Sequence, residues 1–213
     1  MLDHFQELTP KTTKEITETV KSLKSTNSHG YNEIPTKVLK LSLPFIISPV
    51  IYICNKSLLK GIFPTWLKFS QIIPLLKKVK KSEISNYRPI SLLTSFSKIS
   101  EKVIFNRLRN HVNNNNILVH EQFRFRNNSS TEAASYNLIN NILYALNTKF
   151  TVGGIFCDLT KAFDCVNYTI LLSKLEFYGI TSSAYNLMKS YLSDRYQRFL
   201  IKNTSSKNYL SDW

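Results

Sequence analysis

Asp158 is the residue whose type and position hold the most chemical interest, because it stands near the end of an apolar run at 151–159. The run predicts a β-strand, and strand alternation places Asp158 on the same face as Val152 and Phe156. A carboxylate half-buried in that position needs a compensating cation. Mg²⁺ is suitable, since it prefers carboxylate oxygen and phosphoryl-transfer sites share it with substrate phosphates. From the residues alone, Asp158 could equally cap the following turn or pair with Lys161.

Basic residues give the second chemical signal. The chain has 28 Lys and Arg against 14 Asp and Glu, which makes a formal net charge of +14. Between residues 68 and 126, twelve basic residues stand against three acidic ones. Such a surplus predicts a polyanionic partner, and phosphate contact with nucleic acid is the interpretation we favour. For any single lysine, a solvated surface position is the simpler alternative.

The composition predicts a folded, soluble protein. Hydrophobic residues make up 43% of the 213 residues and charged ones 20%, which differs from the composition of disordered chains. Cys54, Cys157 and Cys165 stand far apart without a C-x-x-C pair, which indicates reducing surroundings. The longest apolar run, 43–54, is shorter than the about 20 residues that a membrane span needs. We therefore expect an intracellular protein with no membrane partner, in the nucleus or the cytoplasm.

Hydrophobic periodicity predicts a mixed α/β body that positions these residues. Helices are expected over 12–25, from Pro35, and over 44–60, 97–112, 131–147, 168–178 and 182–194, with strands in 70–81, over 151–159 and in 195–202. The helix at 131–147 is expected to be amphipathic, with an apolar stripe formed by Ala134, Leu138, Ile142 and Leu146. Between the first strand and the next helix lies a basic loop with Lys77, Lys78, Lys80 and Lys81.

Four blocks follow one another between residues 86 and 201: NYRPISLLTSFSKISEKVIFNRL, QFRFRNNSSTEAA, FCDLTKAFDCVNYTILLSKLEFYGI and SYLSDRYQRFL. In order and spacing they resemble the reverse transcriptase of non-LTR retrotransposons, particularly the jockey-like branch. The upstream strings HGYNEIPTKVLK and NKSLLKGIFPTWLKFSQIIPLLKK resemble the region that precedes the fingers in that family. The resemblance covers the chain from about residue 28 to its end.

The resemblance implies an α/β (α+β) fold, an incomplete right-hand polymerase with fingers and the first part of the palm. We expect a helical N-terminal extension over 1–67 and a reverse transcriptase domain over 68–213, truncated before the second catalytic strand pair. The implied partners are an RNA template, a DNA primer and deoxynucleoside triphosphates, whereas protein partners are unknown.

The resemblance also assigns roles to residues around the palm strand. Asp158 would be the catalytic, metal-binding aspartate, with the backbone carbonyl of Leu159 as a second ligand. Phe163 would crowd the sugar 2′ position and favour deoxynucleotides; its alternative is an ordinary core phenylalanine. Asp164 matches the second acid of the family, to which we assign a structural role.

The basic residues of the fingers match family positions too. Arg88 and Lys98 would lean on the incoming triphosphate, where positive charge offsets the charge that develops on the transferred group. Their alternatives are an anchored turn for Arg88 and a solvated helix position for Lys98. Arg126 and Thr131 would line the template or order the fingers. Lys77, Lys78, Lys80 and Lys81 would contact nucleic acid.

Two positions depart from the family pattern. Arg124 stands where the family usually has Gly before Phe-Arg, so the fingers turn is expected to be strained or rearranged. Asn32 stands where an aspartate is common, a milder change because Asn also caps helices well.

The largest departure is the absence from this sequence of the Pro-Gln-Gly and Tyr-x-Asp-Asp segments, the latter supplying further carboxylates for a two-metal Mg²⁺ site. After Asp164 the acids are Glu176, Asp194 and Asp212, none adjacent to another. We therefore expect the N-terminal part of a polymerase core, an RNA-directed DNA polymerase (a nucleotidyltransferase) by family but inactive alone. Two alternatives stay open: a non-catalytic nucleic-acid-binding remnant, or a degenerate gene product.

Overall fold

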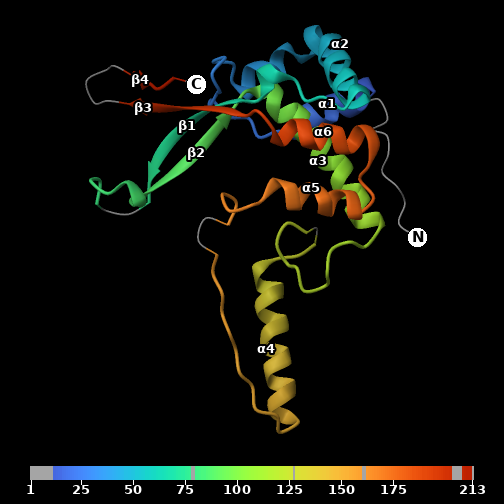
Figure 1. The fold of residues 1–213 in the computed structure, drawn as a ribbon, viewed down its shortest axis with the longest axis vertical. Coiled ribbons are helices and arrows are strands. Elements are labelled where there is room, and N and C mark those ends of the chain that lie inside the picture. The colour runs from blue at the N-terminus through green and yellow to red at the C-terminus, as the bar shows by residue number, and fades with distance from the viewer. Residues whose placement is uncertain (1–11, 78–79, 127, 160–161, 203–207, 213) are drawn as a thin grey trace. The chain divides into compact units, whose positions relative to one another are not determined.

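The computed structural model describes residues 12–77, 80–126, 128–159, 162–202 and 208–212 (Figure 1). These residues combine helices and strands, so the predicted mixed α/β class is confirmed. The helices are α1 (Thr13–Ser22), α2 (Thr36–Lys60), α3 (Ser95–Asn114), α4 (Thr131–Asn147), α5 (Tyr168–Phe177) and α6 (Ser182–Leu192), with short 3₁₀ helices η1 (Thr65–Leu67) and η2 (Ile84–Asn86). The strands are β1 (Phe69–Leu76), β2 (Tyr87–Leu93), β3 (Tyr196–Lys202) and β4 (Asn208–Leu210).

Contacts divide the chain into two compact units. Unit 1 comprises Met1–Asn110 and Tyr168–Trp213, and unit 2 comprises His111–Asn167. Unit 1 contains the sheet and most of the helices, whereas unit 2 contains α4 and the segment that carries Asp158. The expected boundary between residues 67 and 68 falls inside unit 1 and stays a prediction.

The described strands form one sheet in the order β2-β1-β3-β4. β1 lies antiparallel to β2 and parallel to β3, and the β1 and β2 pair extends as a long ribbon (Figure 1). The sequence did not predict β2, because Pro89 in its middle is unfavourable for a strand. In the structure Pro89 lies opposite Pro74 of β1, so two residues that lack an N–H donor occupy the same step of the ladder.

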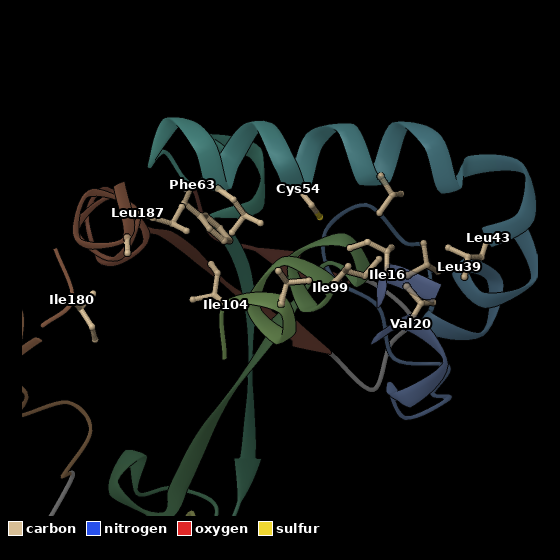
Figure 2. Packing of buried hydrophobic residues seen from close by; sticks show 14 residues of the cluster. Ile16, Val20, Leu39, Leu43, Cys54, Phe63, Ile99, Ile104, Ile180 and Leu187 are labelled. Atoms are coloured by element: carbon tan, nitrogen blue, oxygen red, sulfur yellow. The ribbon is translucent and has the colours of Figure 1, made fainter. Parts of the chain in front are cut away.

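The core of unit 1 forms where α1, α2, α3 and α6 meet. α1 begins with a capping box, in which the Thr12 hydroxyl accepts from the backbone N of Glu15 and the Glu15 carboxylate accepts from the backbone N of Thr12, both at 3.3 Å. Figure 2 shows Ile16 of α1 beside Leu39 of α2 and Ile99 of α3; all three are almost inaccessible to water. The buried apolar side chains of these helices therefore make one continuous core.

α2 differs from the two helices expected over this part of the chain, because it is one helix of 25 residues with Pro44 and Pro49 inside it. Both prolines are exposed, so water can reach the carbonyls that lose a donor one turn earlier. Gly61 caps the C-terminal end of α2 with a φ of 64°, a left-handed conformation that favours a residue without Cβ. By length and composition α2 is also long and apolar enough to cross a membrane, a test that core helices of soluble proteins pass as well.

One expectation for residues 131–159 is wrong. The segment 151–159 forms no strand. A strand needs hydrogen bonds to a neighbouring strand, and no described strand pairs with this segment. α4 has the predicted bounds, yet none of its described side chains is buried. Leu138 is 48% exposed and Leu146 is 56% exposed, so the apolar stripe of α4 is not part of a core within the described residues.

Candidate functional site

Asp158 lies in unit 2 on irregular backbone, and its side chain is exposed. The expectation of a half-buried carboxylate is therefore wrong: with no strand to bury its neighbours, the carboxylate stays in water. No burial penalty then requires a cation at this point. Leu159 is also exposed, at 77%.

The donor chemistry of this segment still suits magnesium. A carboxylate and a backbone carbonyl are both hard oxygen donors, and Mg²⁺ is commonly held by one or two carboxylates together with substrate phosphates. Among the described residues, however, no group of three or more His, Cys, Asp and Glu side chains is arranged to hold a metal ion. Asp158 and Leu159 are consistent with a partial ligand set rather than a complete one.

Phe163 is not a core residue. Its side chain is 79% exposed, and its ring meets the ring of Phe125 edge to face, with 6.5 Å between centroids. The alternative role as an ordinary core phenylalanine is therefore wrong. Asp164 is exposed as well, so the structure shows no buried structural contact for its carboxylate.

The turn around Arg124 has the unusual backbone that the missing glycine predicts, shifted by one residue. Phe125 has a φ of 60°, a left-handed conformation that is costly for a side chain with a Cβ, whereas Arg124 has no positive φ. Asn32, at the other departure, accepts a 3.4 Å hydrogen bond from the backbone N of Ile34, while Pro35 takes the N-cap position of α2. Asn32 therefore orders the turn before the helix.

Arg126 and Thr131 lie on either side of the start of α4. Arg126 is half-buried, and its Nη1 donates to the carbonyl of Val119 at 2.9 Å, so this guanidinium orders its own loop. Thr131 is the first residue of α4 and is exposed; the hydroxyl of Ser130 before it accepts from the backbone N of Ala133. The structure thus gives Arg126 a local ordering contact, while contact with a template stays a prediction.

The basic residues predicted to bind nucleotide and nucleic acid lie in unit 1. Arg88 is exposed on β2, opposite Leu75 of β1. Lys98, on α3, is half-buried and lines a hollow of about 570 Å³ together with Lys102 and Phe105. Of the four lysines in the β1–β2 connection, Lys78 lies outside the described residues, and the other three, Lys77, Lys80 and Lys81, are exposed.

Glu101 and Tyr191, which line the same hollow, belong to a polar network that the sequence did not predict. The hydroxyl of Tyr191 donates to Oε1 of Glu101 at 2.9 Å, and Nη2 of Arg195 lies 3.9 Å from the same oxygen. The Arg195 guanidinium also covers the ring of Tyr191, at 4.6 Å from its centroid. Glu101 lies on α3, Tyr191 on α6 and Arg195 in the connection just before β3, so spacing along the sequence gives no signal for them.

Burial controls the acidity of this network. It raises the pKa of Glu101, against the lowering effects of the Tyr191 hydroxyl, Arg195 and Lys98. It also raises the pKa of Tyr191, to about 12, and the negative charge of Glu101 acts in the same direction. The network therefore joins α3, α6 and the segment before β3 through one carboxylate that is largely shielded from water.

Charge is divided unequally between the two units. Unit 1 contains 24 Lys and Arg against 10 Asp and Glu, whereas unit 2 contains 4 of each kind. The whole net charge of +14 therefore belongs to unit 1, and unit 2, which carries Asp158, is neutral. A polyanion is attracted to unit 1.

Comparisons with known proteins point to one family. The family model described as "Reverse transcriptase (RNA-dependent DNA polymerase)" matches residues 78–211. A protein of Drosophila melanogaster named as the probable RNA-directed DNA polymerase from transposon BS is 35% identical over 92% of this chain and 22% of its own length. The RNA-directed DNA polymerase from mobile element jockey of Drosophila funebris is 30% identical over 87% of this chain and 20% of its own length.

The chain spans about a fifth of the length of these curated relatives. The family match covers more than half of the chain, and the resemblance predicted from the four sequence blocks is confirmed. The chain therefore belongs to the reverse transcriptase (RNA-dependent DNA polymerase) family and is similar to the polymerases of non-LTR retrotransposons.

Proposed function

We propose that this chain forms part of a retrotransposon RNA-directed DNA polymerase, namely the fingers and the first part of the palm. The observation that carries the proposal is the family match over residues 78–211. Residues 1–67 are the helical N-terminal extension, and residues 68–213 belong to the polymerase domain. The protein is intracellular and soluble, with α2 as a core helix. It acts on an RNA template, a DNA primer and deoxynucleoside triphosphates.

In this proposal the residues of unit 1 and those of unit 2 have separate roles. Arg88 and Lys98 bind the triphosphate and offset the negative charge that develops on the transferred phosphoryl group. Phe163 restricts space at the sugar 2′ position, and its ring is exposed, so a nucleotide can reach it. Asp164 supports the segment, while the β1–β2 lysines, Arg126 and Thr131 contact nucleic acid.

Asp158 and the backbone carbonyl of Leu159 are the residues that would hold Mg²⁺. When bound, the metal would neutralise phosphate charge and orient the triphosphate for attack by the primer hydroxyl. The exposed carboxylate of Asp158 needs no rearrangement of a core to reach a ligand. In this role Asp158 binds the positively charged metal through its negative carboxylate. Asp158→Asn would replace the carboxylate by an uncharged amide, which lacks the charge that this role needs.

We further propose that residues 1–213 alone do not polymerise, because a two-metal site needs carboxylates beyond Asp158 and the later acids stand singly. Primer extension tests this: the purified chain is given an RNA template annealed to a DNA primer, deoxynucleoside triphosphates and Mg²⁺. We expect no incorporation above that of Asp158→Asn. Template-dependent incorporation that Asp158→Asn abolishes would contradict inactivity and support the assignment of Asp158.

A second candidate function is nucleic-acid binding without catalysis. The concentration of the whole net charge in unit 1 favours it, since that unit attracts phosphates whether or not Asp158 takes part. Binding of this kind would persist in Asp158→Asn, which separates it from polymerisation.

A further inference from the structure

Four aromatic rings of unit 1 form a cluster, here called the aromatic stack. The rings of Trp66 and Phe69 stack with 5.9 Å between centroids and 25° between planes. Phe69 and Tyr196 stack more closely, at 4.8 Å and 12°. Tyr31 meets Phe69 edge to face at 5.8 Å. The rings come from the turn before α2, η1, β1 and β3, so the fold and not one local segment assembles the aromatic stack.

The aromatic stack is held in place by the backbone but is not buried. The hydroxyl of Tyr31 donates to the carbonyl of Trp66 at 2.8 Å, and the backbone N of Tyr196 donates to the carbonyl of Lys68 at 3.3 Å. Yet Trp66 is 73% exposed and Tyr196 is 42% exposed. The stack therefore presents large, ordered ring surfaces to solvent, a feature more typical of a binding site than of a core.

A cavity adjoins the aromatic stack. It has a volume of about 340 Å³ and includes Tyr31 and Trp66 in its wall, with Val50, Ile53, Pro64 and Phe96 among its other lining residues. The volume lies in the range of small-ligand sites, which are mostly apolar and lined by aromatic rings. Such a wall favours a flat, uncharged group.

Arginines lie on the face of the sheet that carries Phe69 and Tyr196. Phe69 is opposite Tyr196, and two residues further along β1 and β3 Gln71 is opposite Arg198. Paired residues of neighbouring strands share a face, and so do every second residues of one strand. By the same register Arg88 of β2 lies on this face, opposite Leu75. Together with the net charge of unit 1, these arginines favour an anionic ligand.

We propose that the aromatic stack and the adjoining cavity bind an unpaired base of a single-stranded nucleic acid. Trp66 stacks on the base, and the arginines on the same sheet face contact the phosphates that follow it. An exposed aromatic ring and an apolar cavity suit a base, and the neighbouring positive charge suits the phosphates of its strand. Proteins bind single strands by these two means, the stacking of bases on aromatic rings and the attraction of phosphates to positive charge. The proposal rests on nucleic-acid binding within the proposed function and does not require polymerisation.

Trp66 allows a direct test, because the chain has two tryptophans and the other is Trp213. In Trp213→Phe the fluorescence reports Trp66 alone. Single-stranded oligo(rA) and oligo(dA) are compared with an abasic strand of equal phosphate number and with a blunt duplex. We expect quenching by either base-containing single strand, and about tenfold weaker binding of the abasic strand. Equal binding and equal quenching with the abasic strand or the duplex would overturn the proposal.

Affinity measurements on variants give the second arm, using a labelled single strand and fluorescence anisotropy. Trp66→Leu is expected to weaken binding about tenfold, and the matched control Phe45→Leu, an exposed ring (86%) on α2, is expected to leave it unchanged. Equal losses in the two variants would overturn the proposal. If Trp66→Leu fails to fold, as judged by circular dichroism, the quenching arm on Trp213→Phe decides.

The outcomes also separate this inference from the proposed function. Salt-sensitive binding that is equal for base-containing and abasic strands, and is unchanged in Trp66→Leu, would overturn the inference and leave the proposed function standing. Absence of binding to every strand at low salt would overturn both.

Discussion

At the scale of single residues, the chemistry of this chain is divided between an exposed acid and a shielded one. Asp158, the acid singled out by the sequence, lies in water on irregular backbone. Glu101, which no motif singled out, is the carboxylate whose pKa burial raises. The difference follows from packing: Glu101 sits where α3 meets α6, while the segment of Asp158 has no ladder partner among the described strands. The sequence motif identifies an acid of interest, but the packing of the helices and strands determines whether an acid is buried or exposed.

Tyr191→Phe tests the shielded network. The substitution keeps the ring and removes the donor at 2.9 Å from Glu101, leaving the carboxylate with Arg195 at 3.9 Å. We expect a loss of about 1.5–3 kcal/mol in the free energy of unfolding, the range for hydrogen bonds to charged groups, measured by urea denaturation. The control is Tyr136→Phe on α4, a ring that is 69% exposed. Similar small losses in both variants would show that the hydrogen bond contributes little.

The same variant has a pH signature with a defined sign. Because the pKa of Tyr191 is raised to about 12 in the folded state, its stabilising contribution is complete below the ordinary value of 10. The contribution is lost as the pH rises from there through about 12. Alkaline denaturation of the unmodified chain should therefore show this loss, and Tyr191→Phe should lack it.

At the scale of elements, local patterns predicted the helices well and the strands less well. The bounds of α4 and α5 follow from periodicity and stop signals within each segment, and both helices lie where expected. The sequence did not predict β2, and it predicted a strand at 151–159 that the structure does not have. Both errors arise because a strand depends on a partner far away in the chain. α2 was predicted as two helices, since its prolines suggest breaks that exposed positions tolerate.

α2 also carries the clearest prediction about packing. Leu39 is fully buried and Leu41, two residues on, is 72% exposed. Leu39→Ala should lower the free energy of unfolding by about 2–5 kcal/mol through the cavity it leaves. Leu41→Ala in the same helix should change it by no more than about 0.5 kcal/mol, since it touches no core. Denaturant titration of the two variants measures both; equal effects would mean that α2 does not pack through the Leu39 face.

At the scale of the whole molecule, the surplus positive charge and the candidate metal ligand Asp158 belong to different units. The surplus of positive charge was visible in the sequence, but its confinement to unit 1 was not, because that unit is assembled from two separate stretches of the chain. The aromatic stack was hidden for the same reason, as its rings come from residues up to 165 positions apart, from Tyr31 to Tyr196. The family motifs predicted which residues matter, while long-range contacts determine which of them share a surface.

This division of charge predicts how binding depends on salt. The logarithm of the affinity for a single strand falls with the logarithm of salt concentration, with a slope of about −0.7 for each phosphate contacted. If Lys77, Lys80 and Lys81 each contact a phosphate, changing all three to Gln should make the slope shallower by about 2. The matched control changes three exposed lysines of α2, Lys37, Lys56 and Lys60, to Gln, which lowers the net charge equally. A smaller effect in the control would show phosphate contact at the β1–β2 connection, whereas identical slopes in both variants would reduce the interaction to attraction by net charge alone.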